Sequence, residues 1–177
     1  QPTSRLFLVK RGEKMALEDV VERVAAYGCN LVEVTGGEPL AQRESFELIR
    51  ALCDRGFEVL IETSGSIDIG DVDARALAIM DLKCPGSGEE AKNLWSNIDK
   101  LRPRDEIKFV LADRRDYEWA LEVVRKHDLA RWEILFSPVW GAIDLKDLAA
   151  WMLADAVPGR LQIQLHKLVW GPDVKGV

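Results

Sequence analysis

The chain alternates short runs of apolar and β-branched residues with amphipathic stretches of helical period. Strands are predicted to start near Arg5, Leu31, Glu58, Leu77, Glu106 and Trp132. After the first, successive starts lie 27, 19, 29 and 26 residues apart. That is the spacing of parallel strands joined by crossover segments that are mostly helices. The pattern therefore predicts an α/β fold made of repeated βα units.

Three of the crossover stretches place apolar residues at i, i+3, i+4 and i+7, which puts them on one face of a helix. Their apolar stripes begin at Leu17, Tyr117 and Leu145. Asp113 and Asp144 precede the second and third stretches and are predicted to cap those helices. Two further helices are predicted, a longer one over Arg43–Asp54 and a short one over Asn93–Leu101.

The last part of the chain follows another pattern. From Leu161 to Lys167 apolar and polar residues alternate strictly, which predicts a final strand with one polar face. No internal repeat and no linker divides the sequence, so residues 1–177 are predicted to form a single domain.

Charge and composition narrow the class of partner. The chain has 24 Lys+Arg against 30 Asp+Glu and a formal net charge of −6. No block of basic residues is present, which argues against binding nucleic acid through its phosphates. No apolar run approaches the ~20 residues that span a bilayer. A small molecule is the expected partner.

Cysteine usage points to a reducing compartment. Cys29, Cys53 and Cys84 are 24 and 31 residues apart, which fits neither a paired CxxC metal site nor a disulfide framework. A cytoplasmic protein is therefore expected. Cys53 lies on the apolar side of its predicted helix, so packing is the favoured role for its thiol.

Polar residues follow several strands at the point where each strand ends. In α/β sheets and barrels ligands bind beyond these carboxyl ends. Thr35-Gly36-Gly37-Glu38 follows the strand that begins at Leu31, and its glycines let the backbone approach a ligand closely. The polar residues at the next strand ends are Ser64, Asp81, Lys83 and Ser137.

Each of these features has an ordinary structural explanation when it is taken alone. A GGE sequence can be a glycine turn with an exposed acid, and Asp81 with Lys83 can be an ion pair. His166 is more often a hydrogen-bonded structural residue than an acid or base. Their occurrence at three or four successive strand ends favours a ligand site.

The motifs VTGGEPL, ETSGS, MDLKCPGSG, FSPV and QLHKLVWGPDVKGV resemble those of the 7-carboxy-7-deazaguanine synthase family of radical S-adenosylmethionine (SAM) enzymes. The resemblance extends from about Gly12 to Val177. It implies a partial, reduced (β/α) barrel of about six mainly parallel strands, a homodimer, and a carbon–nitrogen lyase of deazapurine and queuosine biosynthesis. Such an enzyme converts 6-carboxy-5,6,7,8-tetrahydropterin to 7-carboxy-7-deazaguanine and releases ammonia.

The resemblance also implies cofactors and roles. A 4Fe-4S cluster, reduced by a donor such as flavodoxin or ferredoxin, would cleave SAM to a 5′-deoxyadenosyl radical, and magnesium would assist. Thr35 would face the pterin. The residues implied to hold SAM are Gly36, Gly37, Glu38, Ser64, Asp81, Lys83 and Ser137. His166 and Lys167 match the tail motif without an assigned role.

One departure from the family pattern is large. The family cluster needs three cysteines in a loop after the first strand, and a magnesium-binding threonine directly follows the last of them. Here RLFLVK passes almost at once into GEKMALEDVV, with no cysteine before Cys29. Either this loop is missing near residues 10–12 of the given chain, or the protein is a pseudoenzyme that binds SAM or a pterin without a cluster.

A third hypothesis is a structural βα domain whose polar mouth pairs with another protein. Exposure of both Trp140 and Trp170 would support it, because aromatic side chains are enriched at protein interfaces.

Overall fold

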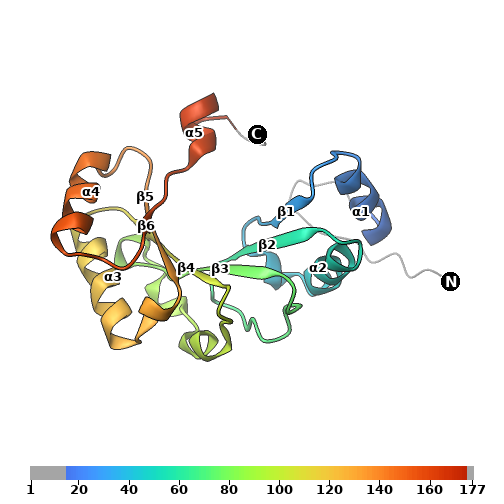
Figure 1. Ribbon diagram of the computed structural model, residues 1–177, viewed down its shortest axis with the longest axis horizontal. Coiled ribbons are helices and arrows are strands. Elements are labelled where there is room, and N and C mark those ends of the chain that lie inside the picture. The colour runs from blue at the N-terminus through green and yellow to red at the C-terminus, as the bar shows by residue number, and fades with distance from the viewer. Residues whose placement is uncertain (1–14, 175–177) are drawn as a thin grey trace. The chain divides into compact units, whose positions relative to one another are not determined.

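The computed structural model describes residues 15–174. The strands in chain order are β1 (Leu31–Val34), β2 (Glu58–Thr63), β3 (Leu77–Asp81), β4 (Glu106–Leu111), β5 (Glu133–Pro138) and β6 (Arg160–Leu161). The α-helices are α1 (Leu17–Ala25), α2 (Glu44–Asp54), α3 (Arg114–Lys126), α4 (Leu145–Ala154) and α5 (Leu165–Trp170), as Figure 1 shows. Single 3₁₀ segments are η1 (Pro39–Ala41), η2 (Pro85–Ser87), η3 (Glu90–Lys92), η4 (Trp95–Lys100) and η5 (Leu129–Arg131).

The six strands form one parallel sheet in the order β1-β2-β3-β4-β5-β6. Strands that are neighbours in the sheet also follow one another in the chain. Each connection therefore returns from the carboxyl end of one strand to the amino end of the next, as in a β/α barrel that has not closed. The predicted α/β class is therefore confirmed. In β1 and β2 the register pairs Val34 with Ile61, so the segments that follow these strands leave the sheet side by side.

The five strands predicted from Leu31 onward all form, and so do the predicted helices. Asp113 caps α3 by accepting a hydrogen bond from the backbone N–H of Asp116 at 3.0 Å. Asp144 caps α4 by accepting from the N–H of Lys146 at 2.8 Å. The short helix expected over Asn93–Leu101 forms as the 3₁₀ segment η4.

The chain divides into two compact units. The first consists of the chain up to Ile79 together with Leu94–Arg102. In this unit α2 contacts β2 and buries Ile49 and Leu52 almost completely. Val59 and Ile61 of β2 are equally buried. Alternation along β2 thus supplies one side of this core, and the helical period of α2 supplies the other.

The second unit consists of Met80–Asn93 and the chain from Pro103 onward. Its core is aromatic. The rings of Phe109 on β4 and Phe136 on β5 stack with centroids 5.9 Å apart. Tyr117 of α3 lies 5.9 Å from Phe136 and 5.7 Å from Trp151 of α4. Both helices are therefore fixed to this part of the sheet through one ring cluster.

The prediction of a final strand over Leu161–Lys167 is wrong. The strand β6 ends at Leu161, and a helix begins at Leu165. Gln162 still donates its N–H to the carbonyl of Phe136 at 2.9 Å, but the next bond of a parallel ladder would need an N–H from Pro138. Proline has none, so the ladder stops and the chain leaves the sheet.

Two sequence features lie outside the described residues. These are the strand predicted near Arg5 and the junction near residues 10–12. Within residues 15–174 no helix has both the length and the apolar character needed to cross a membrane.

Candidate functional site

The ends of β1 and β2 meet at the carboxylate of Glu38. Glu38 precedes η1, and its own backbone is extended, so the side chain reaches across to the residues that close β2. Its Oε1 accepts hydrogen bonds from the N–H of Leu40 and the hydroxyl of Thr63, both at 3.0 Å. Its Oε2 accepts from the N–H of Ser64 at 2.7 Å and from the Ser64 hydroxyl. The structure therefore brings together Glu38 and Ser64, two of the residues implied to bind SAM.

All the groups that donate to Glu38 are neutral. Among residues 15–174 no Lys or Arg side chain pairs with this carboxylate, so its charge is oriented but not neutralised. Such a carboxylate suits a ligand ammonium group. The Ser64 hydroxyl also lies 2.9 Å from the Ser66 hydroxyl and can exchange one partner for the other.

The glycine pair before Glu38 faces open space. Gly36 has a φ of +151°, a backbone conformation that residues other than glycine rarely adopt. A Cβ atom added at Gly36 or Gly37 would meet nothing within 4 Å. Thr35 is exposed beside them. The backbone of this loop is therefore accessible to a ligand that also reaches Glu38.

Asn97 holds the turn that follows β2. Its side-chain amide is fully buried, donates to the carbonyls of Gly65 and Ile67, and accepts from the N–H of Ile69. Sequence reasoning missed this residue, because it lies about 30 positions away in η4 and belongs to no motif.

Asp81, Lys83 and Ser137 belong to the second unit. Lys83 Nζ pairs with Asp81 Oδ2 at 2.5 Å, so the ion pair considered as an alternative exists. The backbone of Lys83 exchanges two hydrogen bonds with the side chain of Asn93. Ser137 lies within β5 and is 1% exposed. The roles of these three residues in SAM binding stay predictions.

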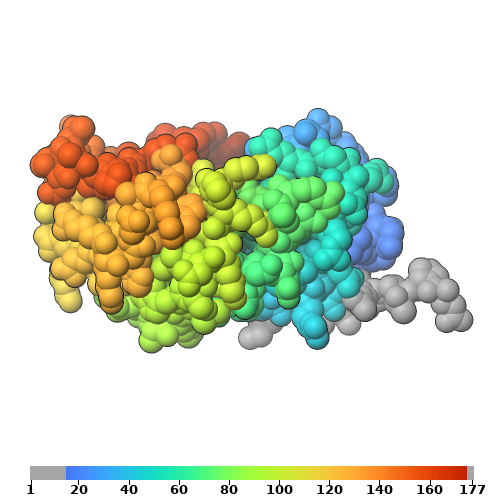
Figure 2. Space-filling model, turned by 60° about the horizontal axis from the view of Figure 1, so that its bottom comes forward, coloured from blue at the N-terminus to red at the C-terminus, as the bar shows by residue number. Residues whose placement is uncertain are grey.

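The tail residues also lie in the second unit. His166 and Lys167 belong to α5 rather than to a strand, and both are half-buried. Trp140 and Trp170 are both exposed, at 42% and 55%. Leu165, Leu168 and Val169 of α5 are exposed to more than half. Figure 2 shows this C-terminal part of the chain, in orange to red, at the surface of the second unit.

An apolar groove of about 490 Å³ runs beside the tail. Its apolar lining includes Val139, Trp140, Leu145, Ile163 and Leu168. Both tryptophans whose exposure would support an interaction surface are exposed, and Trp140 lines this groove.

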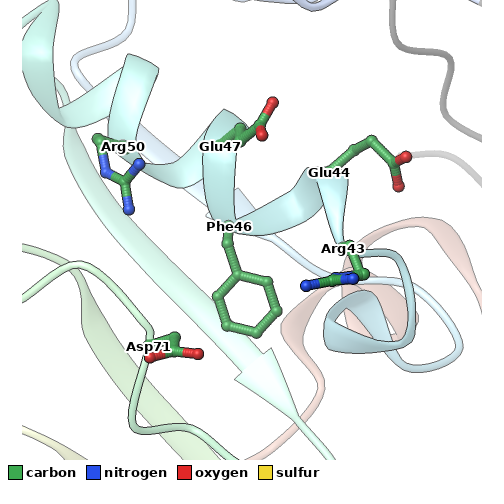
Figure 3. A pocket seen from close by; sticks show the side chains of 6 residues that line it. All are labelled: Arg43, Glu44, Phe46, Glu47, Arg50 and Asp71. Atoms are coloured by element: carbon green, nitrogen blue, oxygen red, sulfur yellow. The ribbon is translucent and has the colours of Figure 1, made fainter.

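A second hollow, of about 670 Å³, lies beside α2 in the first unit. Figure 3 shows Arg43, Phe46 and Arg50 on one side of the helix, with Asp71 of the β2–β3 connection opposite. Glu44 and Glu47 also line the hollow, although their side chains point away from Asp71 in this view. None of the residues implied by the motifs lines this hollow.

The thiols of the described chain do not fit a 4Fe-4S cluster, which is held by thiolates. Cys29 is exposed, whereas Cys53 and Cys84 are buried in different units. Burial raises the pKa of both buried thiols, and nearby carboxylates raise the pKa of Cys84 further. Raised pKa values disfavour the thiolate form that binds iron. Within residues 15–174 no three His, Cys, Asp or Glu side chains lie together as a metal site.

Comparison with known proteins gives close relatives. The chain is 43% identical to the 7-carboxy-7-deazaguanine synthase of Chlorobaculum tepidum over 170 residues, which cover 94% of the chain and 77% of the relative. It is 41% identical to the Koribacter versatilis enzyme of the same name, with 97% of the chain and 83% of the relative covered. The chain belongs to the 7-carboxy-7-deazaguanine synthase family. The resemblance drawn from the motifs is thereby confirmed.

A third relative agrees with these two. The enzyme of this name from Leptospira interrogans is 36% identical over 95% of the chain and 76% of the relative. No family model matches the chain. Because these relatives carry the name of an enzyme, they give no support to a purely structural domain.

One relative has extra residues inside the aligned region. The alignment with the Koribacter enzyme runs over 189 positions, whereas the whole chain has 177 residues. That relative therefore has at least 12 residues, inside the aligned region, with no counterpart in this chain.

Proposed function

We propose that this chain has the family's lyase activity and converts 6-carboxy-5,6,7,8-tetrahydropterin to 7-carboxy-7-deazaguanine with loss of ammonia, in the deazapurine and queuosine pathway. The observation that carries the proposal is the Glu38 carboxylate, which neutral donors hold at the joined ends of β1 and β2.

Glu38 would bind the amino group of SAM, because an oriented carboxylate without a cationic partner attracts an ammonium group. Gly36 and Gly37 would leave room for the methionine part of the ligand. Ser64 would keep the carboxylate in place through its N–H, while its hydroxyl could turn toward Ser66 when the ligand arrives. Thr35, exposed next to the glycines, would face the pterin. SAM, when bound, supplies the adenosyl group on which radical chemistry of this family depends.

The protein environment of the reaction is proposed to contain a 4Fe-4S cluster and magnesium that residues 15–174 do not hold. The Koribacter relative has residues inside the aligned region that this chain lacks, as a cluster loop missing from the given chain would require. The three cysteines of the described chain do not fit a cluster, so its residues account only for placing SAM and the pterin.

The partners proposed are a pterin substrate, an electron donor such as flavodoxin or ferredoxin, and a second copy of the chain. Exposed Trp140 and Trp170, with the apolar residues of α5, support an association between copies. Homodimer interfaces are more apolar than the rest of the protein surface and are enriched in aromatic side chains.

The experiment starts from the complete gene, expressed and purified without oxygen and supplied with iron and sulfide. Absorbance of an iron–sulfur cluster and conversion of the tetrahydropterin to 7-carboxy-7-deazaguanine are expected. In parallel, equilibrium dialysis of the present chain with labelled SAM is expected to show binding that Glu38→Gln removes.

Two results would overturn the proposal. One is the failure of the complete gene product to take up iron, which would leave a binding module. The other is unchanged SAM affinity in Glu38→Gln, with Arg115→Ala as a matched surface control, which would remove Glu38 from the site.

A further inference from the structure

The turn after β2 supplies the groups that orient Glu38. These are the hydroxyl of Thr63 and the N–H and hydroxyl of Ser64. A backbone donor such as the Ser64 N–H cannot be aimed by choosing a rotamer, so its direction depends on the conformation of the turn itself. Whatever fixes this turn therefore also fixes the carboxylate.

Both polar atoms of the Asn97 side chain form hydrogen bonds with this turn. Its Nδ2 donates to the carbonyl of Gly65 at 3.1 Å and to that of Ile67 at 2.7 Å. Its Oδ1 accepts from the N–H of Ile69 at 3.2 Å. The same Gly65 carbonyl also accepts from the N–H of Leu94, the residue before η4, at 3.1 Å. Four hydrogen bonds thus join η4 and its start to the segment after Ser64.

The burial of Asn97 makes these bonds costly to lose. Asn97 is 0% exposed, and a buried amide without partners is strongly destabilising. Packing alone would be satisfied by an apolar side chain such as its neighbour Ile98, which is also buried. Only a side chain with both a donor and an acceptor can hold two carbonyls and an N–H of one turn at the same time.

We infer that Asn97 is a positioning residue for ligand binding, acting through the Gly65–Ile69 backbone on Ser64 and from there on Glu38. The inference rests on the proposed function, because it takes the Glu38 carboxylate to be the group that holds the SAM amino group. Asn97 itself touches no ligand.

The decisive variant is Asn97→Asp, which keeps the acceptor for Ile69 but replaces both donated hydrogen bonds with a carboxylate facing two carbonyls. At pH 8 we expect its dissociation constant for SAM, measured by equilibrium dialysis on the 177-residue chain, to rise about tenfold or more. Toward pH 5 the ratio of variant to unmodified affinity should recover in part, because the introduced carboxyl group, once protonated, donates one of the two lost hydrogen bonds.

A buried carboxylate also lowers stability in a pH-dependent way, so the affinities are compared only at pH values where urea unfolding shows that the variant is fully folded. Leu52→Ala is the matched control, since it removes a buried side chain of α2 in the same unit and lowers stability without touching the turn. Its SAM affinity should equal that of the unmodified chain at temperatures where both are folded.

A second variant covers the case in which Asn97→Asp does not fold. Leu94→Pro deletes the N–H that donates to Gly65 and suits the local backbone, because Leu94 has φ −86° and Asn93 before it is extended. We expect a smaller loss of affinity, about twofold to fivefold, since Asn97 still holds the Gly65 carbonyl.

The outcomes separate the two proposals. If Glu38→Gln loses SAM while Asn97→Asp and Leu94→Pro bind it normally, the Asn97 inference is wrong and the proposed pocket stands. If Glu38→Gln binds SAM normally, the pocket is wrong and the Asn97 inference fails with it. An affinity loss in Asn97→Asp that does not change between pH 8 and pH 5 also contradicts the inference.

Discussion

The backbone N–H of Ser64 donates to Glu38 Oε2 at 2.7 Å and ties the loop after β1 to the turn after β2. The two residues are 26 positions apart in the chain and meet because β1 and β2 are parallel and end together. This hydrogen bond fixes one of the carboxylate oxygens independently of any ligand. Its consequences for stability can therefore be tested without SAM.

Glu38→Gln should destabilise the fold by about 1–3 kcal/mol, because the new amide NH₂ places a donor against the donors of Thr63 and Ser64. Urea unfolding of the 177-residue chain measures the change. Glu58→Gln, at an exposed strand residue, serves as the control and should change stability by less than about 0.5 kcal/mol. Equal stabilities of the two variants would contradict a stabilising role for the hydrogen bonds between Glu38 and the turn after β2.

Because of Tyr117, the free energy of unfolding should change with pH in the alkaline range. Its buried hydroxyl donates to Asp155 Oδ2 at 2.9 Å, and burial first, then this hydrogen bond, raises the pKa of Tyr117 above its usual range. The unfolded chain releases this proton near the ordinary tyrosine pKa of ~10. The contribution of Tyr117 to the free energy of unfolding is therefore complete below that pH and falls as the pH rises further.

Unfolding free energies measured between pH 8 and pH 11 should therefore fall less steeply in Tyr117→Phe than in the unmodified protein. At pH 7 the variant should lose about 1 kcal/mol for the missing hydrogen bond. Tyr27→Phe, at a side chain that is 77% exposed, should keep the unmodified slope. The same slope in Tyr117→Phe would show that another group causes it.

Gly159 is required for the contact between β6 and β5. A Cβ at this position would lie 2.7 Å from the carbonyl oxygen of Ile134 and 2.8 Å from the ring of Phe136. Gly159→Ala should destabilise the protein by about 1–3 kcal/mol, because a strand and a packed ring must move. Gly37→Ala, which meets nothing within 4 Å, should leave urea unfolding nearly unchanged, and a comparable loss in both variants would refute the steric argument.

The three thiols should react at different rates. Cys29 is exposed, whereas Cys53 and Cys84 are buried and have raised pKa values. A thiol reagent such as dithionitrobenzoate should modify one thiol per folded chain quickly and three in denaturant. Cys29→Ser should remove the fast phase, and rapid reaction of two or more thiols in the folded chain would contradict the described burial.

Local patterns were sufficient for most of the fold. The helical period around Leu17 and Tyr117 and the apolar runs at Leu31 and Glu58 depend on near neighbours, and each formed the predicted element. The polar residues at the strand ends could also be predicted, since Gly36 and Glu38 directly follow the strand that begins at Leu31. Glu38 and Ser64 could be expected to meet because parallel strands end at one edge.

Long-range features could not be read in this way. The alternating tail from Leu161 to Lys167 satisfies the local rule for a strand, but the absent N–H of Pro138, more than 20 residues earlier, ends the ladder. The role of Asn97 likewise depends on carbonyls about 30 residues away. Neither residue differs in sequence context from many others that have no such effect.

The shortness of β6 has a consequence for behaviour in concentrated solution. Open sheets with long, flat outer strands recruit strands from other molecules and begin to aggregate. Here the sheet ends in a strand of only two residues, and the chain turns into α5 soon afterwards. By ending the ladder, Pro138 leaves hardly any free backbone at this border for a foreign strand to join.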